Sequence, residues 1–382
     1  MLLTTQTQLH EFVEHARTSP ILAIDTEFLR EKTYWPKLCL LQLGTYEHQV
    51  AIDPFQCINL EPLKELFLNK DILKIVHAGT QDLEIIFHEL HCVPTPIFDT
   101  QIAATLLGNA LQIGYAALVQ SFCSIKLKKE DSYTDWSMRP LTNSQITYAL
   151  NDVKYLPQIY DGMREQLESL GRLEWLRDDF LELENAQNYE PHPMQRYLKL
   201  KRVNQLYGTQ LACAQRIAAW REERAVTRNV PRKFIMSDEQ IIEICKREPK
   251  TLDDLFMVRG VSRAVDMDDA RELLQICIES RHVPDAQIPR LPRLQGGATN
   301  VDAQVDFLSA FARKRARENN VAFAVLVSQH ELAQIARGHL HNLEVLKGWR
   351  KTLVGDDLVR LAQGKLSISL RDGDICITEI SR

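Results

Sequence analysis

The sequence predicts an α/β domain with a mixed sheet, followed by two small all-α domains. Strand-like apolar segments alternate with helical ones up to about residue 100, and from there to residue 185 almost everything reads as helix. Two proline-containing segments, 188–195 and 282–300, then separate stretches with helical periodicity only. A chain of 382 residues is also too long for one ordinary core. We therefore expect domains at 1–190, 196–283 and 300–382.

The first domain opens with an amphipathic helix over roughly residues 7–17. Three apolar segments follow, ILAI, LCLLQL and VAID, and loops containing Pro36 and Gly44 separate them, a spacing typical of an antiparallel meander. Helical LEPLKELFLN then precedes the strand ILKIVH, and helical QDLEIIFHEL precedes a short strand, IFD. Strands that alternate with helices indicate a mixed sheet with crossover helices.

The two C-terminal units have similar size and helical character, which suggests divergent copies of one module. The last unit differs near its end, where LSISLRDGDICITEI places two alternating runs around DGD. This pattern predicts a β-hairpin.

Composition argues against a membrane or secreted protein. No apolar run approaches the roughly 20 residues of a membrane helix, and the N-terminus lacks the basic and apolar regions of a secretory signal. The eight cysteines include no CxxC pair, which argues against zinc and fits reduced thiols. We expect a cytoplasmic protein with no membrane contact. Nothing demands a partner chain, so we expect a monomer.

The charge is distributed unevenly along the chain. Residues 1–191 hold 15 basic and 27 acidic residues, 192–300 hold 19 and 14, and 301–382 hold 12 and 10. An acidic first half joined to a basic remainder hints at a polyanionic partner. Ordinary solvated faces explain the charges equally well.

Three acidic motifs stand out in the first domain. In ILAIDTEF, Asp25 and Glu27 end an apolar strand two residues apart, so they share one face. Asp82 falls in the first turn of the helix after HAG, and Tyr148 and Asp152 share a helix face in YALND. Each has an ordinary explanation: a solvated strand end, an Asp stabilised by a helix dipole with Thr80 as a possible N-cap, and a core tyrosine beside a surface acid. Buried like charges, however, need neutralisation, and grouped carboxylates suit Mg²⁺ or Mn²⁺.

The three motifs together are DTE, H-A-G-x-x-D and Y-x-x-x-D. Asp82 of the second lies 55 residues after Glu27, and Asp152 of the third lies 70 residues after Asp82. In this order and spacing they resemble the tyrosine branch of the DEDD superfamily of 3′–5′ exonucleases. AIDTEFLREKTYWPKLCLLQL, FDTQIAATL and TDWSMRPLTNSQITYALNDVKYL resemble bacterial ribonuclease D over about residues 20–170. This resemblance implies a ribonuclease H-like fold and a 3′–5′ exoribonuclease that acts on RNA such as tRNA precursors and releases 5′-mononucleotides. It also implies that Asp25, Glu27, Asp82 and Asp152 hold two divalent ions.

Within that site, Asp25 is the expected bridging ligand, and Tyr148 is expected to orient the attacking water, since its ordinary pKa near 10 makes it a poor base. Asp99 is a fifth acid that we expect to cap the next helix. Among possible RNA contacts, Phe28 suits base stacking or the core, and Tyr34 or Trp35 suits the substrate entrance. His77 is more readily explained as a structural histidine than as an RNA contact.

Residues around 200–281 resemble the HRDC domain, a helical module that assists nucleic-acid binding; LACAQRIAAWREERAVTRNVPRKFIMSDEQIIEIC carries the likeness. Arg228, Arg232 and Lys233 are the candidate phosphate contacts; a solvated surface is the alternative for each. Residues 301–375 form a more divergent HRDC-like unit by position and helicity. Two other functions stay open: a DNA 3′–5′ exonuclease on the same scaffold, and a non-catalytic RNA-binding relic.

Overall fold

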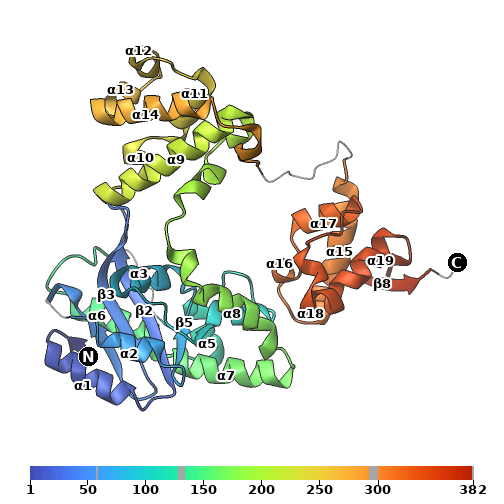
Figure 1. Cartoon of the computed structure of the whole chain (residues 1–382). Coiled ribbons are helices and arrows are strands. Elements are labelled where there is room, and N and C mark those ends of the chain that lie inside the picture. Colours follow the sequence, from blue (N-terminus) through green and yellow to red (C-terminus); the bar gives the residue numbers. More distant parts are fainter. Residues whose placement is uncertain (57–58, 128–133, 292–299, 381–382) are drawn as a thin grey trace. The chain divides into compact units, whose positions relative to one another are not determined.

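The computed structural model describes residues 1–56, 59–127, 134–291 and 300–380 (Figure 1). By their contacts, the described residues within 1–27, 39–188 and 295–382 form one compact unit, and those within 28–38 and 189–294 form a second. The predicted linker at 282–300 lies partly outside the described residues. The division into three domains stays a prediction.

A six-stranded mixed sheet lies at the centre of the first unit, as the sequence predicts. Its strands are β1 (Leu2–Leu3), β2 (Ile21–Leu29), β3 (Lys37–Gly44), β4 (Gln49–Ile52), β5 (Leu73–Val76) and β6 (Ile97–Asp99). Their order is β1-β4-β3-β2-β5-β6, with β1/β4, β2/β5 and β5/β6 parallel and β3/β4 antiparallel. The parallel pairing of β2 with β5, in which Ala23 lies opposite Ile75, brings two strand ends side by side.

The helices that follow and connect these strands begin at recognisable signals. A capping box of Thr5 and Gln8 starts α1, the predicted first helix, and another of Thr142 and Gln145 starts α6. The α-helices are α1 (Gln6–Ala16), α2 (Leu63–Leu68), α3 (Thr80–Leu90), α4 (Thr100–Thr105), α5 (Tyr115–Cys123), α6 (Asn143–Lys154), α7 (Leu156–Ser169) and α8 (Arg177–Glu184). The short 3₁₀ helices are η1 (Pro54–Gln56), η2 (Leu173–Leu176) and η3 (Ala186–Tyr189).

The second unit is helical, as predicted. Its core packs Ala214, Ile217 and Ala218 of α9 with Ile241 of α11 and Leu273 of α14. The elements are η4 (Pro193–Lys199), η5 (Val203–Gln205), α9 (Thr209–Arg228), α10 (Arg232–Ile235), α11 (Asp238–Arg247), α12 (Leu252–Phe256), α13 (Val261–Ala264), α14 (Met267–Ser280) and η6 (Asp285–Gln287).

The last segment of the chain is helical with an added hairpin, so the expectation of an all-α domain is wrong there. The predicted hairpin itself is confirmed: β7 and β8 are antiparallel, and Asp372 and Gly373 both have positive φ in the turn. The elements are α15 (Asp302–Glu318), α16 (Phe323–Leu326), α17 (Gln329–Ala336), η7 (Glu344–Leu346), α18 (Gly348–Arg350), a π-helical turn at Lys351–Gly355, α19 (Asp356–Ala362), β7 (Leu366–Arg371) and β8 (Asp374–Glu379).

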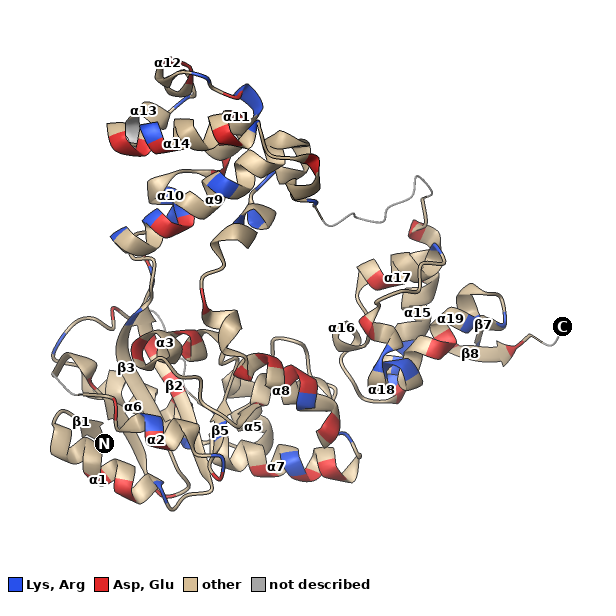
Figure 2. Ribbon diagram, viewed as in Figure 1, with Lys and Arg blue, Asp and Glu red and all other residues tan. Residues whose placement is uncertain are grey.

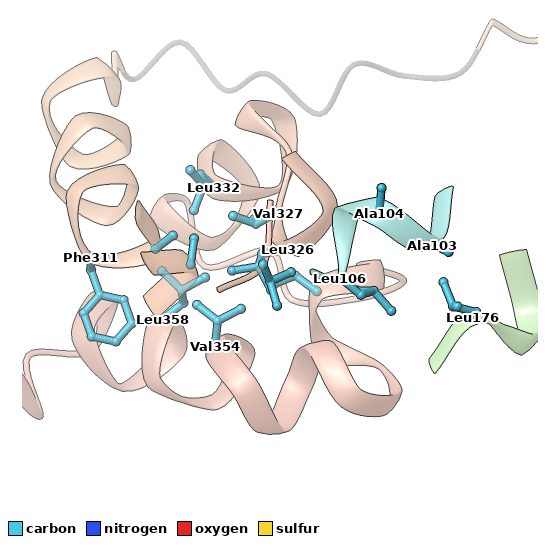
Figure 3. Close-up of a cluster of buried hydrophobic side chains, with 14 of the residues drawn as sticks. Ala103, Ala104, Leu106, Leu176, Phe311, Leu326, Val327, Leu332, Val354 and Leu358 are labelled. Atoms are coloured by element: carbon cyan, nitrogen blue, oxygen red, sulfur yellow. The ribbon is translucent and has the colours of Figure 1, made fainter. Parts of the chain in front are cut away.

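One hydrophobic cluster joins this last segment to the helices after β6. Figure 3 shows Leu106 and Leu176 in the same cluster as Leu326, Val354 and Leu358. Charge differs between the elements: Figure 2 shows several acidic residues on α8. No helix in the described ranges has both the length and the apolar character that crossing a bilayer requires.

Candidate active site and metal centre

Asp25 and Glu27 lie on β2, two residues apart, so their side chains share one face of the strand. The four residues before them, Ile21–Ile24, are buried in the core, whereas both acids are only half-buried. The strand therefore leaves the hydrophobic core at Asp25, and its two carboxylates lie at the boundary of the core.

A tight turn after β5 positions the third acid. Ala78 has φ 55°, and a Cβ on Gly79 would lie 2.6 Å from the Val76 side chain, so the turn needs glycine at that position. Asp99 holds the turn, because its carboxylate accepts hydrogen bonds from the backbone N–H groups of Ala78 (3.1 Å) and Gly79 (2.9 Å). The same carboxylate caps α4, which confirms that prediction.

The helix α3 then begins directly after this turn. Its N-cap is Gly79, so the alternative that Thr80 caps the helix is wrong. Asp82 lies in the first turn, as predicted, and only 8% of its surface is exposed. The Thr26 hydroxyl donates a hydrogen bond to the Asp82 carboxylate. Because Thr26 lies between Asp25 and Glu27 on β2, this bond ties the third acid to the strand of the first two.

The helix α6 supplies the last two residues. Tyr148 and Asp152 are four positions apart and therefore share a face. Both side chains line the same pocket. Burial and the neighbouring acids raise the pKa of Tyr148 above its usual value. The phenol is therefore held protonated, as a hydrogen-bond donor.

The acids of β2 and α6 converge on one point. One carboxylate oxygen from each of Asp25, Glu27 and Asp152 can be chosen so that all three lie within 4.8 Å of one another. Burial raises the pKa of all four acids, and the charges of Asp82, Asp152 and Glu27 raise that of Asp25 further. Such mutual repulsion marks a site that favours protons or a cation. Grouped hard oxygen ligands fit a divalent ion such as Mg²⁺.

We expect the metal-free protein to lose stability as the pH rises from 5.5 to 8. Burial and the charges of Asp152 and Asp82 raise the pKa of Glu27 from 4.5 to about 8 in the folded state. In this window the folded protein keeps a proton that the unfolded chain has released. The free energy of unfolding should therefore fall with pH, by up to about 1.4 kcal/mol per unit for each such group.

Urea denaturation in EDTA at several pH values measures this slope. Glu27→Gln should flatten it, and saturating Mg²⁺ should restore stability mainly at the high-pH end. A metal-free stability that increases over the same window would contradict the shared repulsion of these acids.

Two further residues support the site, and the sequence indicated them only as part of TDWSMRPL. Arg139 forms a bidentate ion pair with buried Asp53 (2.7 and 2.8 Å) and donates to the carbonyl oxygens of Trp136 and Met138. The Trp136 ring, 4% exposed, lies 6.0 Å from the Tyr148 ring, centroid to centroid. Arg139 thus holds the loop whose tryptophan packs against the site tyrosine.

A pocket of about 540 Å³ opens beside Tyr148 and Asp152. Its polar lining comes mainly from Asn143, Thr147 and Asn151 of α6. Ligand pockets of small molecules typically measure about 300–1,000 Å³. The space next to the acidic cluster is therefore large enough for one nucleotide.

The predicted RNA contacts have varied surroundings. Nδ1 of His77 lies 2.9 Å from the Thr100 hydroxyl and its ring lies 5.8 Å from that of Tyr115, which supports the structural alternative. Phe28 is half-buried. Trp35 packs against the core of the helical unit, and Tyr34 is buried within that core rather than lining an open entrance. The role of each in binding RNA stays a prediction.

In the helical unit, the three predicted cations are not equivalent. Arg228 pairs with Asp269 (2.8 Å) and Arg232 with buried Glu222, whereas the Lys233 side chain is exposed. Sequence spacing did not reveal the basic pocket, about 360 Å³, because its lining joins η4 to α9 and α10. The basic residues that line it are Arg196, Lys199, Lys201, Arg221, Arg232 and Lys233.

This chain is similar to known proteins over nearly its whole length. Residues 1–168 match the family described as 3′-5′ exonuclease, and residues 210–277 match the HRDC domain. Proteins named ribonuclease D from Acidiphilium cryptum and Sphingobium indicum are 36% and 37% identical over 100% and 99% of this chain, and 97% and 98% of their own lengths. The crystal structure of Escherichia coli RNase D, an exoribonuclease involved in structured RNA processing, covers 95% of this chain and 98% of its own at 28% identity, with a TM-score of 0.81.

Proposed function

This chain belongs to the ribonuclease D family, and from that membership we propose that it is a metal-dependent exonuclease that shortens RNA from the 3′ end and releases 5′-mononucleotides. The convergence of Asp25, Glu27 and Asp152 is the observation that carries the proposal. A half-buried group of like charges is costly unless a cation binds there. A fold kept only for RNA binding has no need of it.

We assign two divalent ions, Mg²⁺ or Mn²⁺, to Asp25, Glu27, Asp82 and Asp152. When bound, two such ions activate a water on one side of the phosphodiester and stabilise the leaving 3′ oxygen on the other. Asp25 would be the ligand shared by both ions, because burial raises its pKa and the charges of all three other acids raise it further. The Thr26 hydroxyl orients the Asp82 carboxylate from the strand.

Tyr148 positions the attacking water as a protonated hydrogen-bond donor and acceptor rather than as a base. The raised pKa of its phenol and its place in the same pocket as Asp152 support this role. The adjacent pocket along α6 would hold the terminal nucleotide. The side-chain amides and hydroxyls that line this pocket can form hydrogen bonds with the base and the sugar.

Tyr148→Phe should lower kcat by about 10–100-fold, since small losses of alignment cost about that much. The affinity for Mn²⁺ should change little, because the acids stay in place. Single-turnover kinetics and a Mn²⁺ titration measure the two separately. An unchanged rate would remove Tyr148 from the mechanism; a large loss of Mn²⁺ affinity would make it a support of the ligands instead.

We further propose that structured RNA, with tRNA precursors as the first case, is the natural substrate, and that the protein acts as a monomer in the cytoplasm. The family membership supports the RNA substrate, and the free state of the seven described cysteines fits a reducing compartment. Lys199, Lys201 and Lys233 of the basic pocket carry exposed side chains that suit phosphate contacts.

The proposal is tested with a 5′-labelled RNA and a DNA of the same sequence. With Mg²⁺, the wild type should convert the RNA into a ladder that shortens from the 3′ end, and Asp152→Asn should not. Equal rates on DNA would favour a DNA exonuclease. Binding of RNA without any shortening would favour a non-catalytic RNA-binding protein.

A further inference from the structure

The loop between β2 and β3, residues 30–36, belongs to the helical unit although both of its ends continue into the sheet. Residues 28–38 group with residues 189–294 by their contacts. The Tyr34 side chain, 7% exposed, is part of the same hydrophobic cluster as Ile217 and Ile235. The strand that carries two of the acids therefore continues, from Phe28 on, as a part of the helical unit.

Polar contacts hold the Tyr34 side chain from several directions. Its hydroxyl donates to Glu222, a carboxylate with 1% side-chain exposure, and accepts from Arg232 (2.9 Å). The Arg232 guanidinium lies 4.6 Å above the ring centroid. Arg196 also pairs with Glu222, at 2.7 Å. The tyrosine thus completes the coordination of a buried charge, and such sites tolerate a missing partner poorly.

The backbone of the loop is held as well. Oδ1 of Asn229 accepts hydrogen bonds from the N–H groups of both Tyr34 and Trp35, each at 3.1 Å. Asn229 ends α9 in the left-handed conformation, with φ 46°. The end of the longest helix of the unit therefore fixes the loop seven residues after Glu27.

From these contacts we propose that Tyr34 is a positioning residue for the metal centre: by docking into the helical unit, it holds the end of β2 and so the Glu27 carboxylate. The inference rests on the proposed function. Metal ligands must keep their places to within about 0.5 Å, and Glu27 is separated from the anchored residues only by a short strand end and loop. The helical unit would then support chemistry on any substrate, in addition to the phosphate contacts proposed for it.

The test uses the full chain and compares two anchor variants with a control. Tyr34→Phe removes the hydroxyl, and Asn229→Gly removes the acceptor while keeping a residue that tolerates positive φ. Thr251→Ala is the control, because it removes the side-chain cap of α12 in the same unit, and Thr251 is not one of the residues named above that hold the loop. The readouts are Mn²⁺ affinity and kcat and KM on a trinucleotide RNA. Its few phosphates limit any contribution from the basic pocket of the helical unit.

Both anchor variants should weaken Mn²⁺ binding about 3–10-fold and lower trinucleotide kcat by a similar factor. This is less than the roughly 10–100-fold cost of losing a residue that contacts a metal ligand directly, because Tyr34 acts on Glu27 through the chain between them. Thr251→Ala should match the wild type. Wild-type Mn²⁺ affinity in both anchor variants would overturn the proposal, as would an equal loss in Thr251→Ala, which would indicate general destabilisation. If the wild type does not cleave RNA, the proposed function fails, and the Mn²⁺ titrations still decide whether Tyr34 positions the ligands.

Discussion

Asp25→Asn should lower nuclease activity by more than about 100-fold and, at pH 8 without metal, make the protein more stable. Losing a residue that merely supports a metal ligand costs about 10–100-fold, so losing the ligand expected to be shared costs more. Stability should rise because the pKa of Asp25 is raised by burial and by three neighbouring acids. Removing its charge relieves that repulsion.

Activity on labelled RNA and urea denaturation in EDTA measure the two effects in one variant. Asp71→Asn is a matched control, because Asp71 is an exposed aspartate of the same unit, away from the site. It should change neither quantity. An inactive Asp25→Asn that is also less stable than the wild type without metal would mean that Asp25 is a structural residue.

Arg139→Met should lower the free energy of unfolding by about 3–5 kcal/mol, because it leaves a buried carboxylate unpaired. Asp53 is 2% exposed, and although burial by itself raises its pKa, the ion pair with Arg139 holds the pKa below its usual value. The variant also loses the bonds that hold the carbonyl groups of Trp136 and Met138. Activity should therefore decline along with stability.

A double-mutant cycle with Asp53→Asn isolates the ion pair. The double variant should be more stable than Arg139→Met alone, since it removes the unpaired charge. Arg139→Lys should be intermediate, because lysine keeps the charge and loses the planar fork. Additive losses in the cycle would show that Arg139 acts only through the backbone carbonyl groups.

The features that the sequence predicted correctly are those set by residues a few positions apart. Asp25 and Glu27 at two residues, and Tyr148 and Asp152 at four, define shared faces on a strand and a helix, and the structure has both. The alternating runs around DGD likewise predicted the hairpin β7–β8. In each case neighbouring residues alone determine the geometry.

What the sequence did not reveal depends on residues far apart in the chain. Arg139 and Asp53 are 86 positions apart, and Tyr34 and Glu222 are 188 apart, so no periodicity connects them. The alternative that Thr80 caps α3 was wrong for a related reason. Asp99, from beyond the next strand, binds the turn and leaves Gly79 as the N-cap.

The central claim is that four acids from β2, α3 and α6 hold two divalent ions, and a Mn²⁺ titration followed by electron paramagnetic resonance tests it most directly. The wild-type chain should bind two Mn²⁺ ions, with affinity that falls as the pH drops below the raised pKa values of the acids. Asp25→Asn should lose at least one of them. A wild type that binds no Mn²⁺, or an Asp25→Asn variant that binds both ions with unchanged affinity, would contradict the account.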